Sequence, residues 1–395
     1  MTALLAALPR DGRLLFVTRF TRLVAYGALS VVLVLYLTTL GLGPSQIGLL
    51  LTLTLVGDTL VSLWLTTRAD RFGRRRTLII GAALMAAAGL VFALTANFVF
   101  LVIAGTVGVI SPSGNEVGPF LPIEQAALAH VVPTDLRTEV FAWYTLAGAF
   151  ATALGSLSAG VVSQTRPYRA VLLLYAALGM VLAIWFTRLS PAVEPAAPET
   201  SAFLGLGPSR RIVLRLAGLF ALDSFAGGFV VQSFAAYWFY LRFGATPATL
   251  GAIFFGANLL AGLSALLAAR LAARFGLVRT MVFTHLPSNV LLILVPLMPT
   301  LALATLVLFM RFSISQMDVP TRQSYLMAVV KPEERSAAGG VTGVARTIGA
   351  GVAPVFAGLL FAQPALINVP FFVAGTLKIV YDLLLYRGFA RLSSS

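Results

Sequence analysis

The chain has 395 residues, of which 59% are hydrophobic and only 11% are charged, and it contains no cysteine. Soluble proteins carry about a quarter of their residues as charged side chains, so this composition excludes a soluble globular protein and indicates one that lies in a membrane. Disulfide bonds and thiol chemistry are also excluded. The formal net charge of +14 comes from basic residues grouped at the ends of apolar segments, so we expect no nucleic-acid partner.

Apolar stretches of about 20 residues, the length that a helix needs to cross the hydrocarbon of a bilayer, recur along the chain. They predict twelve spans, at 14–40, 45–67, 77–96, 98–131, 138–163, 168–187, 212–241, 247–271, 279–297, 301–329, 337–362 and 366–386. Each span must be helical, because an open strand would leave backbone polar groups unsatisfied in lipid.

Basic residues distinguish the two sides of the predicted membrane protein. With the N-terminus inside, the outside loops hold only Arg166, Arg169 and Arg242, whereas the inside segments hold clusters of arginine such as 68–76 and the group of Arg10, Arg13, Arg19 and Arg22. Cytoplasmic loops are enriched in lysine and arginine. Both termini are therefore predicted to be cytoplasmic.

The chain repeats one template. Two constant spacings, of 203 and 198 residues, relate its halves. The first spacing relates Gly41 to Gly244, Pro44 to Pro247, Gly48 to Gly251 and Gly73 to Gly276; the second relates Pro122 to Pro320, Gln125 to Gln323, Arg137 to Arg335 and Gly160 to Gly358. Two copies of one apolar template are typical of a membrane transporter.

A polar stretch rich in proline and alanine follows the sixth span, at 190–201. Such a composition suits a flexible linker. The predicted domains are an N-terminal six-helix bundle at 1–189, a cytoplasmic linker at 190–210 and a C-terminal six-helix bundle at 211–395.

The loop between the second and third spans reads Asp70-Arg71-Phe72-Gly73-Arg74-Arg75-Arg76. With this loop and its echo at 273–279, nearly the whole chain resembles the major facilitator superfamily. The sequence departs from the family pattern at Thr66, where the family usually has glycine. The resemblance implies an all-α membrane protein with twelve transmembrane helices in two pseudo-symmetric six-helix bundles, working by alternating access.

The same loop predicts a cytoplasmic gate. In the functional interpretation, Asp70 and Gly73 form a latch against a helix N-terminus of the other half, where the helix dipole attracts negative charge, and Arg71 and Arg74 pair with acids there. In the alternative, these arginines only enforce the topology. Glu124 and Arg322, equivalent in the two repeats and opposite in charge, are expected to form a pseudo-symmetric salt bridge near this gate.

The fourth span is interrupted by three prolines and two glycines, at 112, 114, 118, 119 and 122. Prolines and glycines break a regular helix, and a broken helix is tolerated in a bilayer only where protein or a cavity satisfies the freed groups. Glu116 lies in this stretch, and Asp318 is its counterpart in the tenth span.

Three acids within the spans are candidates for proton coupling: Glu116, Asp318 and Asp58. A charged side chain in hydrocarbon costs about 2.5–3.5 kcal/mol or more and is a functional-site hypothesis by default. The alternatives are that Glu116 is neutralised by a partner such as Arg311, and that Asp58 belongs to a gating pair.

Polar residues of the spans that the family uses to line its cavity are the candidates for substrate binding. They are Tyr26, Asn115, Asp223, Gln232, Arg311 and Gln316. For Asp223 a structural role is equally open. Lys378 and Asp382, four residues apart on the last helix, are expected to pair with each other, and His285 is expected to form a hydrogen bond within its bundle.

These features predict a secondary transporter, not an enzyme, of a bacterial-type cytoplasmic membrane. The expected activity is proton-coupled export of an amphipathic compound, weakly supported by the glycine spacing at 148–160, where Ser156 replaces the proline of the family's antiporter signature. The alternative is proton-coupled uptake of an organic anion attracted by Arg311 and Arg322. No cofactor or metal is expected; the expected partners are a small solute, protons and the bilayer, and the protein is expected to work as a monomer.

Overall fold

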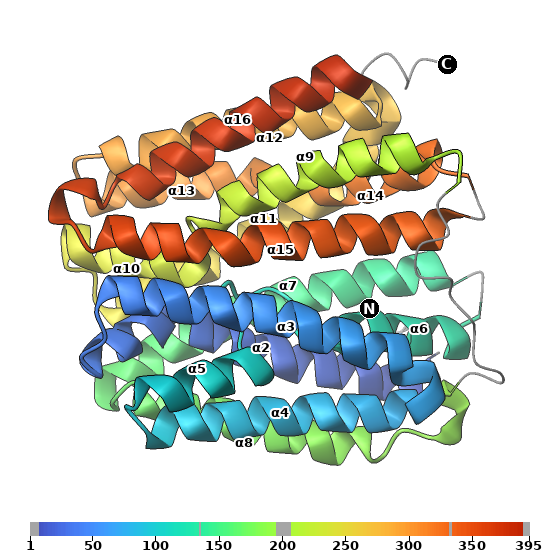
Figure 1. The fold of residues 1–395 in the computed structure, drawn as a ribbon, viewed down its shortest axis with the longest axis horizontal. Helices are drawn as coiled ribbons and strands as arrows, with labels where there is room; N and C mark the ends of the chain where they lie inside the picture. The colour runs from blue at the N-terminus through green and yellow to red at the C-terminus, as the bar shows by residue number, and fades with distance from the viewer. Residues whose placement is uncertain (1–7, 134–135, 195–206, 332–333, 390–395) are drawn as a thin grey trace. The chain divides into compact units, whose positions relative to one another are not determined.

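The computed structural model describes residues 8–133, 136–194, 207–331 and 334–389, without the side chains of residues 70, 71, 137, 138, 269 and 336. Throughout these residues the regular elements are helices (Figure 1). The middle of the predicted linker, at 195–206, lies outside the described residues.

The helices from the first half of the chain follow the predicted spans. They are α2 (Arg10–Thr39), α3 (Pro44–Phe72), α4 (Arg74–Leu94), α5 (Phe98–Val107), α6 (Phe120–Val131), α7 (Arg137–Thr165) and α8 (Arg169–Phe186). A 3₁₀ turn at Pro191–Val193 follows α8.

The second half repeats this order. Its helices are α9 (Arg210–Gly228), α10 (Gln232–Phe243), α11 (Pro247–Phe275), α12 (Leu277–Leu294), α13 (Leu301–Ser315), α14 (Asp318–Val329), α15 (Arg335–Phe361) and α16 (Val369–Phe389).

Eleven candidate membrane spans are found in the described residues, against the twelve predicted. The difference lies at the predicted fourth span, where the chain forms two short helices, α5 of 10 residues and α6 of 12 residues. The backbone between them takes positive φ at Gly114 and Gly118, which a helix does not allow. The predicted interruption of this span is therefore confirmed.

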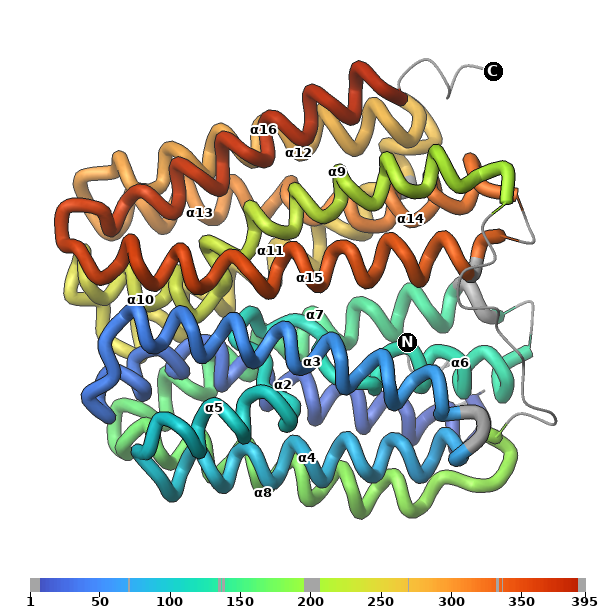
Figure 2. The backbone as a smooth tube through the Cα atoms, in the orientation of Figure 1, coloured from blue at the N-terminus to red at the C-terminus, as the bar shows by residue number. Residues whose placement is uncertain are grey.

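The described chain divides into two compact units. Unit 1 comprises Met1–Leu42, Val56–Thr200 and Thr246–Phe255, and unit 2 comprises Gly43–Leu55, Ser201–Ala245 and Gly256–Ser395. Within unit 1, α2 packs against α7 and α4 against α8; within unit 2, α9 packs against α15 and α12 against α16 (Figure 2). The same pairing recurs in the order that the sequence repeat predicts.

The units differ from the predicted bundles because two helices are shared between them. The first part of α3 belongs to unit 2, where Gly48 meets Gly358 so closely that a Cβ on Gly48 would lie 2.8 Å from the Gly358 Cα. The first part of α11 belongs to unit 1, where a Cβ on Gly251 would lie 2.8 Å from the Gly160 Cα. All four glycines belong to the sequence repeat, so the same kind of glycine-mediated helix crossing occurs once in each unit.

Candidate functional site

Arg22, on α2, is the centre of a buried ionic cluster in unit 1. Its guanidinium Nη1 and Nη2 donate to the two carboxylate oxygens of Glu124, on α6, at 2.8 and 2.7 Å. Its Nε and Nη2 also donate to Glu116 at 3.2 and 3.1 Å. Arg22 is fully buried, and two-pronged bonds of this kind are among the strongest that an arginine makes.

Glu124 has further partners that leave its carboxylate fully bonded. Thr18 of α2 donates to Oε1 at 3.0 Å, and the hydroxyl of Tyr144 of α7 donates to Oε2 at 2.5 Å. Glu124 is therefore tied to both α2 and α7 in the middle of unit 1. A buried charge of this kind is tolerated because it is paired and hydrogen-bonded.

Arg19 lies one turn before Arg22 on the same face of α2. Its Nη2 is 3.3 Å from the Glu116 carboxylate, and its guanidinium carbon lies 4.3 Å from the centre of the Tyr144 ring. Nε and Nη1 of Arg19 are buried and have no hydrogen-bond partner in the part of the chain that the structure describes. With two arginines and two glutamates, the cluster is neutral overall.

Asp58, on α3, forms a hydrogen bond to the backbone of the interrupted fourth span. Its Oδ1 accepts the backbone N–H of Gly118 at 2.7 Å and, at 3.5 Å, the hydroxyl of Ser62. The described residues give it no ion pair. Gly118 has φ +77°, so its N–H is freed by the break between α5 and α6 and Asp58 satisfies it.

Unit 2 carries a second buried ionic cluster. Asp223 of α9 accepts from Arg322 of α14 at 3.0 Å and from Lys378 of α16 at 2.5 Å. Arg322 also lies 3.4 Å from Asp318, one turn before it on α14. Two cations thus surround Asp223, which favours the structural role left open for this residue.

His285, on α12, lies between two carboxylates of unit 2. Its Nδ1 is 2.8 Å from Asp382 and its Nε2 is 3.7 Å from Asp223. Asn289 donates to the other oxygen of Asp382 at 2.9 Å. The expected hydrogen bond of His285 within its bundle is confirmed.

The expected pair of Lys378 and Asp382 is wrong. Helix α16 packs against both α9 and α12, so Lys378 reaches Asp223 on α9, whereas Asp382 reaches His285 on α12. Spacing along one helix predicts a pair only where no better partner lies on a neighbouring helix.

The salt bridge expected between Glu124 and Arg322 differs from the bonds that these residues make. Glu124 is bonded to Arg22 in unit 1, and Arg322 is bonded to Asp223 in unit 2. Each residue thus takes its partner from the first helix of its own repeat. Their role in gating stays a prediction.

The remaining residues predicted to bind substrate have varied surroundings. The hydroxyl of Tyr26 donates to the Val117 carbonyl at 3.2 Å, and Gln232 accepts from Asn258 at 3.1 Å. Asn115 is exposed in the break of the fourth span, and Gln316 follows α13 at the corresponding break of the tenth. The guanidinium carbon of Arg311 lies 4.9 Å from the centre of the Phe312 ring, and its buried Nε has no partner within the described ranges.

The predicted gate loop is held at the start of α4. Gly73 has φ +95°, which explains glycine there. The backbone N–H groups of Arg74 and Arg75 donate to the Glu194 carboxylate at 2.6 and 3.0 Å, a negative charge at a helix N-terminus. Arg74 also donates to the Val193 carbonyl, so its described bonds run to the 3₁₀ turn that follows α8 and to Glu194 directly after it. The side chains of Asp70 and Arg71 lie outside the described residues.

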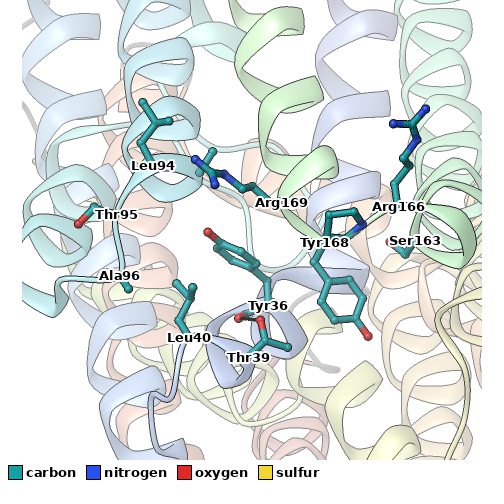
Figure 3. A pocket seen from close by; sticks show the side chains of 12 residues that line it. Tyr36, Thr39, Leu40, Leu94, Thr95, Ala96, Ser163, Arg166, Tyr168 and Arg169 are labelled. Atoms are coloured by element: carbon teal, nitrogen blue, oxygen red, sulfur yellow. Dashed lines mark hydrogen bonds between the residues drawn. The ribbon is translucent and has the colours of Figure 1, made fainter.

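A cavity of about 600 Å³ opens in unit 1 where α2 and α4 end and α8 begins. Its charged lining residues are Arg166 and Arg169, and the Arg169 side chain lies beside Tyr36 (Figure 3). The residues predicted to bind substrate are not among those that line it. A second cavity, of about 430 Å³, is lined in unit 2 by apolar residues of α9 and α15.

Sequence reasoning missed the roles of Arg19, Arg22 and Lys378, and the identity of the carboxylate partners of His285. The two arginines were assigned to topology because they lie near the N-terminus. Their position inside an apolar segment, three residues apart on one helical face, was the available signal. For His285 and Lys378 the sequence gives no comparable signal, because their partners lie on other helices.

The fold and its buried charges define a multi-pass membrane protein of the transporter class. A family model described as Major Facilitator Superfamily matches residues 15–242. A relative from the yeast Saccharomyces cerevisiae, named only as an uncharacterized membrane protein, is 32% identical over 95% of this chain and 93% of its own length. The chain belongs to the major facilitator superfamily.

Solved structures share the fold at low sequence identity. The nucleoside transporter NupG matches with a TM-score of 0.76 at 14% identity, over 96% of this chain and 99% of that one. A D-xylose–proton symporter matches with a TM-score of 0.72 at 15% identity, over 95% and 97%. The human organic anion transporter MFSD10 matches with a TM-score of 0.64 at 14% identity, over 95% and 100%.

Proposed function

We propose that this protein is a secondary transporter of a small amphipathic organic anion and that transport is coupled to protons. The negative charge of the solute is inferred from an imbalance between unpaired donors and paired acids among the buried groups. Arg19, Arg311 and Arg346 each have buried guanidinium N–H groups with no hydrogen-bond partner among the described residues. A buried unpaired donor costs about 1–3 kcal/mol, and more when charged, so such groups call for an acceptor that arrives with the solute.

The acids of the two clusters and of the second span, on α3, already have partners among the described residues. Hydrogen-bond or ionic partners are found for Asp58, Glu116, Glu124, Asp223, Asp318 and Asp382. A cationic solute would have to displace an arginine, lysine or backbone donor from one of them. An anionic solute can bind donors that are already free.

The apolar part of the solute is supported by unit 2. The cavity of about 430 Å³ lies along α9 and α15, next in the chain to Arg346, and is lined by Phe225, Leu222, Ile348 and smaller residues. Phe225 and Phe229 stack edge to face with centroids 5.2 Å apart. An aromatic surface of this kind suits the ring of an amphipathic solute.

Among the three acids expected to couple protons, the geometry favours Glu116. Its side chain is 16% exposed, whereas Asp318 is buried against Arg322, and Asp58 holds a backbone N–H of the interrupted span. A coupling group must exchange protons with water, and Glu116 is the most open of the charged groups in the first cluster.

Direction and location are proposals as well. Export, expected from the glycine spacing of α7, and uptake of an organic anion are the two candidates, and one related solved structure is named an organic anion transporter. The membrane is expected to be the cytoplasmic one of a bacterial-type cell, although the relative at 32% identity is from yeast.

The test uses two permanently charged aromatic solutes in proteoliposomes, so that passive leakage of a neutral form is avoided. Counterflow of labelled benzenesulfonate and phenyl phosphate is compared with that of benzyltrimethylammonium, with protein-free liposomes as control. We expect counterflow of at least one anion and none of the cation. Counterflow of the cation, or of neither anion, would overturn the proposal. An internal pH dye then reports whether protons move with or against the anion.

A further inference from the structure

We propose that the cavity in unit 1, where α2 and α4 end and α8 begins, binds the phosphate group of an anionic phospholipid. The cavity encloses about 600 Å³, a volume typical of ligand sites in proteins. The residues expected to bind the transported solute are not among those that line it. This lipid site is therefore separate from the transport function proposed above.

The cavity carries positive charge that no acid of the chain balances. Arg166, directly after α7, and Arg169, at the start of α8, both line it and are exposed (Figure 3). Neither forms an ion pair with a described residue. The six predicted outside loops contain no aspartate or glutamate, even with their flanking residues, at 40–46, 95–99, 162–170, 240–248, 296–302 and 361–369. A negative partner for the two arginines on that side therefore comes from another molecule.

The helix packing that the two repeats share does not require these arginines. The 198-residue spacing of the repeat places Pro364 and Ile367 at the positions of Arg166 and Arg169. The same helix pairs nevertheless form in both units. Arginine is also less common in outside loops than in inside ones. Ligand binding accounts for two arginines at this place, whereas packing accounts for neither.

A hydroxyl group in the cavity wall adds a further donor. Ser163 lies on α7 one turn before Arg166, and its buried Oγ has no hydrogen-bond partner among the described residues. Three other hydroxyl groups of the wall are bonded to backbone groups; they belong to Tyr36, Thr39 and Thr95. Ser163 and the two arginines thus offer donors that suit phosphate oxygens, and the residues that line the cavity include no carboxylate to repel them.

An apolar stripe continues from the cavity along α4. Its members recur at spacings of three and four residues, so they share one face of the helix, and all are exposed; they are Ile80, Ala83, Ala87, Leu90 and Leu94. Leu94 is 66% exposed and also lines the cavity. On α8, which packs against α4, the exposed Leu173 lies one turn after Arg169. A cationic cavity and an apolar helix face are therefore continuous.

The length of the stripe suits an acyl chain. From residue 80 to residue 94 the helix rises about 21 Å, and one leaflet of hydrocarbon is about 15 Å thick, half of the bilayer core. Spans end at the level of the lipid headgroups, so a lipid whose chain lies on the stripe has its phosphate at the cavity. A water-soluble anion needs no such stripe, which favours a lipid as the occupant.

The charges of the cavity also select among lipid headgroups. Two neighbouring guanidinium groups attract a phosphate but repel the ammonium group of phosphatidylcholine or phosphatidylethanolamine. Phosphatidylglycerol carries the same phosphate without a cation. The site should therefore bind phosphatidylglycerol more tightly than phosphatidylcholine.

Native mass spectrometry of the 395-residue protein measures binding of dioleoyl phosphatidylglycerol and dioleoyl phosphatidylcholine, which have the same acyl chains. The double variant Arg166→Gln with Arg169→Gln should bind phosphatidylglycerol about 25-fold more weakly than the wild type, about fivefold for each arginine. Arg242→Gln, at the third arginine of the predicted outside loops, is the control, because this residue does not line the cavity. Equal binding of the two lipids by the wild type, or unchanged binding of phosphatidylglycerol by the double variant, would overturn the inference.

A second pair of variants fills the cavity without changing any charge. Ala96 is exposed in the cavity wall, and Ala96→Trp should weaken binding of phosphatidylglycerol about as much as the double arginine variant does. Ala365→Trp, at an exposed position in the last predicted outside loop, is the matched control. Monodispersity in detergent and melting temperature show that both are folded. Equal binding of phosphatidylglycerol by these two variants would contradict the proposed site.

Competition identifies the source of the phosphate. Dioctanoyl phosphatidylglycerol, a short-chain lipid, should displace the dioleoyl lipid, whereas sn-glycerol 3-phosphate and benzenesulfonate, which have no acyl chain, should not do so at the same concentration. Displacement by sn-glycerol 3-phosphate would make this a site for a soluble phosphate, and displacement by benzenesulfonate would make it a site for the transported anion. Either result would overturn the assignment to a lipid.

Discussion

Arg22 on the first helix of one repeat and Asp223 on the first helix of the other carry opposite charges, and each bridges to the fourth span of its own repeat. Arg22 is bonded to Glu124 and Asp223 to Arg322, and Glu124 and Arg322 are related by the same 198-residue spacing as Pro122 and Pro320. The same bridge between the first and fourth spans of a repeat has thus been made twice, with its polarity reversed.

Reversal of the charges keeps each bridge neutral while changing its surroundings. The positive member lies on α2 in unit 1, beside a second arginine, Arg19. In unit 2 the negative member lies on α9 and gathers Arg322 and Lys378 around it. The two repeats therefore share the same helix pairing and differ in the sign of the charge on their first helix.

The first prediction concerns the bridge of Arg22. Glu124→Gln should destabilise the protein by about 3–5 kcal/mol, because it leaves Arg22 buried with one carboxylate fewer. The melting temperature in detergent and the yield of monodisperse protein report the loss. The double variant Arg22→Glu with Glu124→Arg, which copies the polarity of unit 2, should recover part of it; a double variant no better than the worse single one would contradict a direct bridge.

The second prediction separates Asp58 from proton coupling. Asp58→Asn keeps an oxygen that can accept the Gly118 N–H, so folding and pH-gradient-driven transport should both persist. Asp58→Leu removes the acceptor and should cost about 1–3 kcal/mol of stability. Transport by both variants is followed with and without a pH gradient. Loss of only the gradient-driven component in Asp58→Asn would identify Asp58 as the coupling acid instead.

The third prediction concerns acid stability at the start of α15. The carboxylate of Glu334 accepts hydrogen bonds from Ser209 and from the Gly207 backbone N–H, and these lower its pKa below the usual 4.5. A group with a lowered folded pKa stabilises the protein above its unfolded pKa, and this contribution is lost as the pH falls through the folded value.

Melting temperatures between pH 7 and pH 3 test this assignment. The melting temperature of the wild-type protein should fall below about pH 4.5, and Glu334→Gln should be less stable at pH 7 and flatten that part of the curve. Glu139→Gln, at an exposed position early in α7, is the control and should leave the curve as in the wild type. Parallel curves for wild type and Glu334→Gln would count against the assignment.

The fourth prediction concerns the crossing of α3 and α15. Gly48→Ala places a Cβ 2.5 Å from the Pro354 carbonyl oxygen and 2.8 Å from the Gly358 Cα, so the helices must separate, at a cost of about 1–3 kcal/mol. A lower melting temperature and slower counterflow are expected. Gly343→Ala, on α15 with no atom within 4 Å of its Cβ, should match the wild type. Equal stability of the two variants would show that the crossing tolerates separation.

The spans, the repeat and the broken fourth span were predictable because each depends on local composition. A helix that crosses hydrocarbon needs a long apolar run, and the residues between Pro112 and Pro122 forbid a regular one. The glycines of the repeat were also visible, although the sequence did not show that Gly48 would meet Gly358. Contact partners depend on how helices pack, and packing is a property of several segments together.

The charged site was less predictable for the same reason. Glu116 and Asp318 were identified from their position in apolar spans; Arg322, the partner of Asp318, lies one turn later on the same helix, but the arginine partners of Glu116 lay elsewhere in the sequence. Arg311 was proposed as a partner of Glu116, and the structure gives that place to Arg19 and Arg22. Lys378 was paired with its neighbour on the same helix, because spacing along one helix is all that a sequence shows directly.

The bond between Arg22 and Glu124 can form only after both residues have been synthesised. The two residues are 102 positions apart, so at about 5–20 residues per second a ribosome needs on the order of 5–20 seconds to add Glu124 after Arg22. During that interval an arginine at the centre of a span would cost about 2.5–3.5 kcal/mol. The first helix of this protein therefore lacks the Glu124 partner of Arg22 until α6 is synthesised, so the earliest helix to be translated is among the later ones to gain its final contacts.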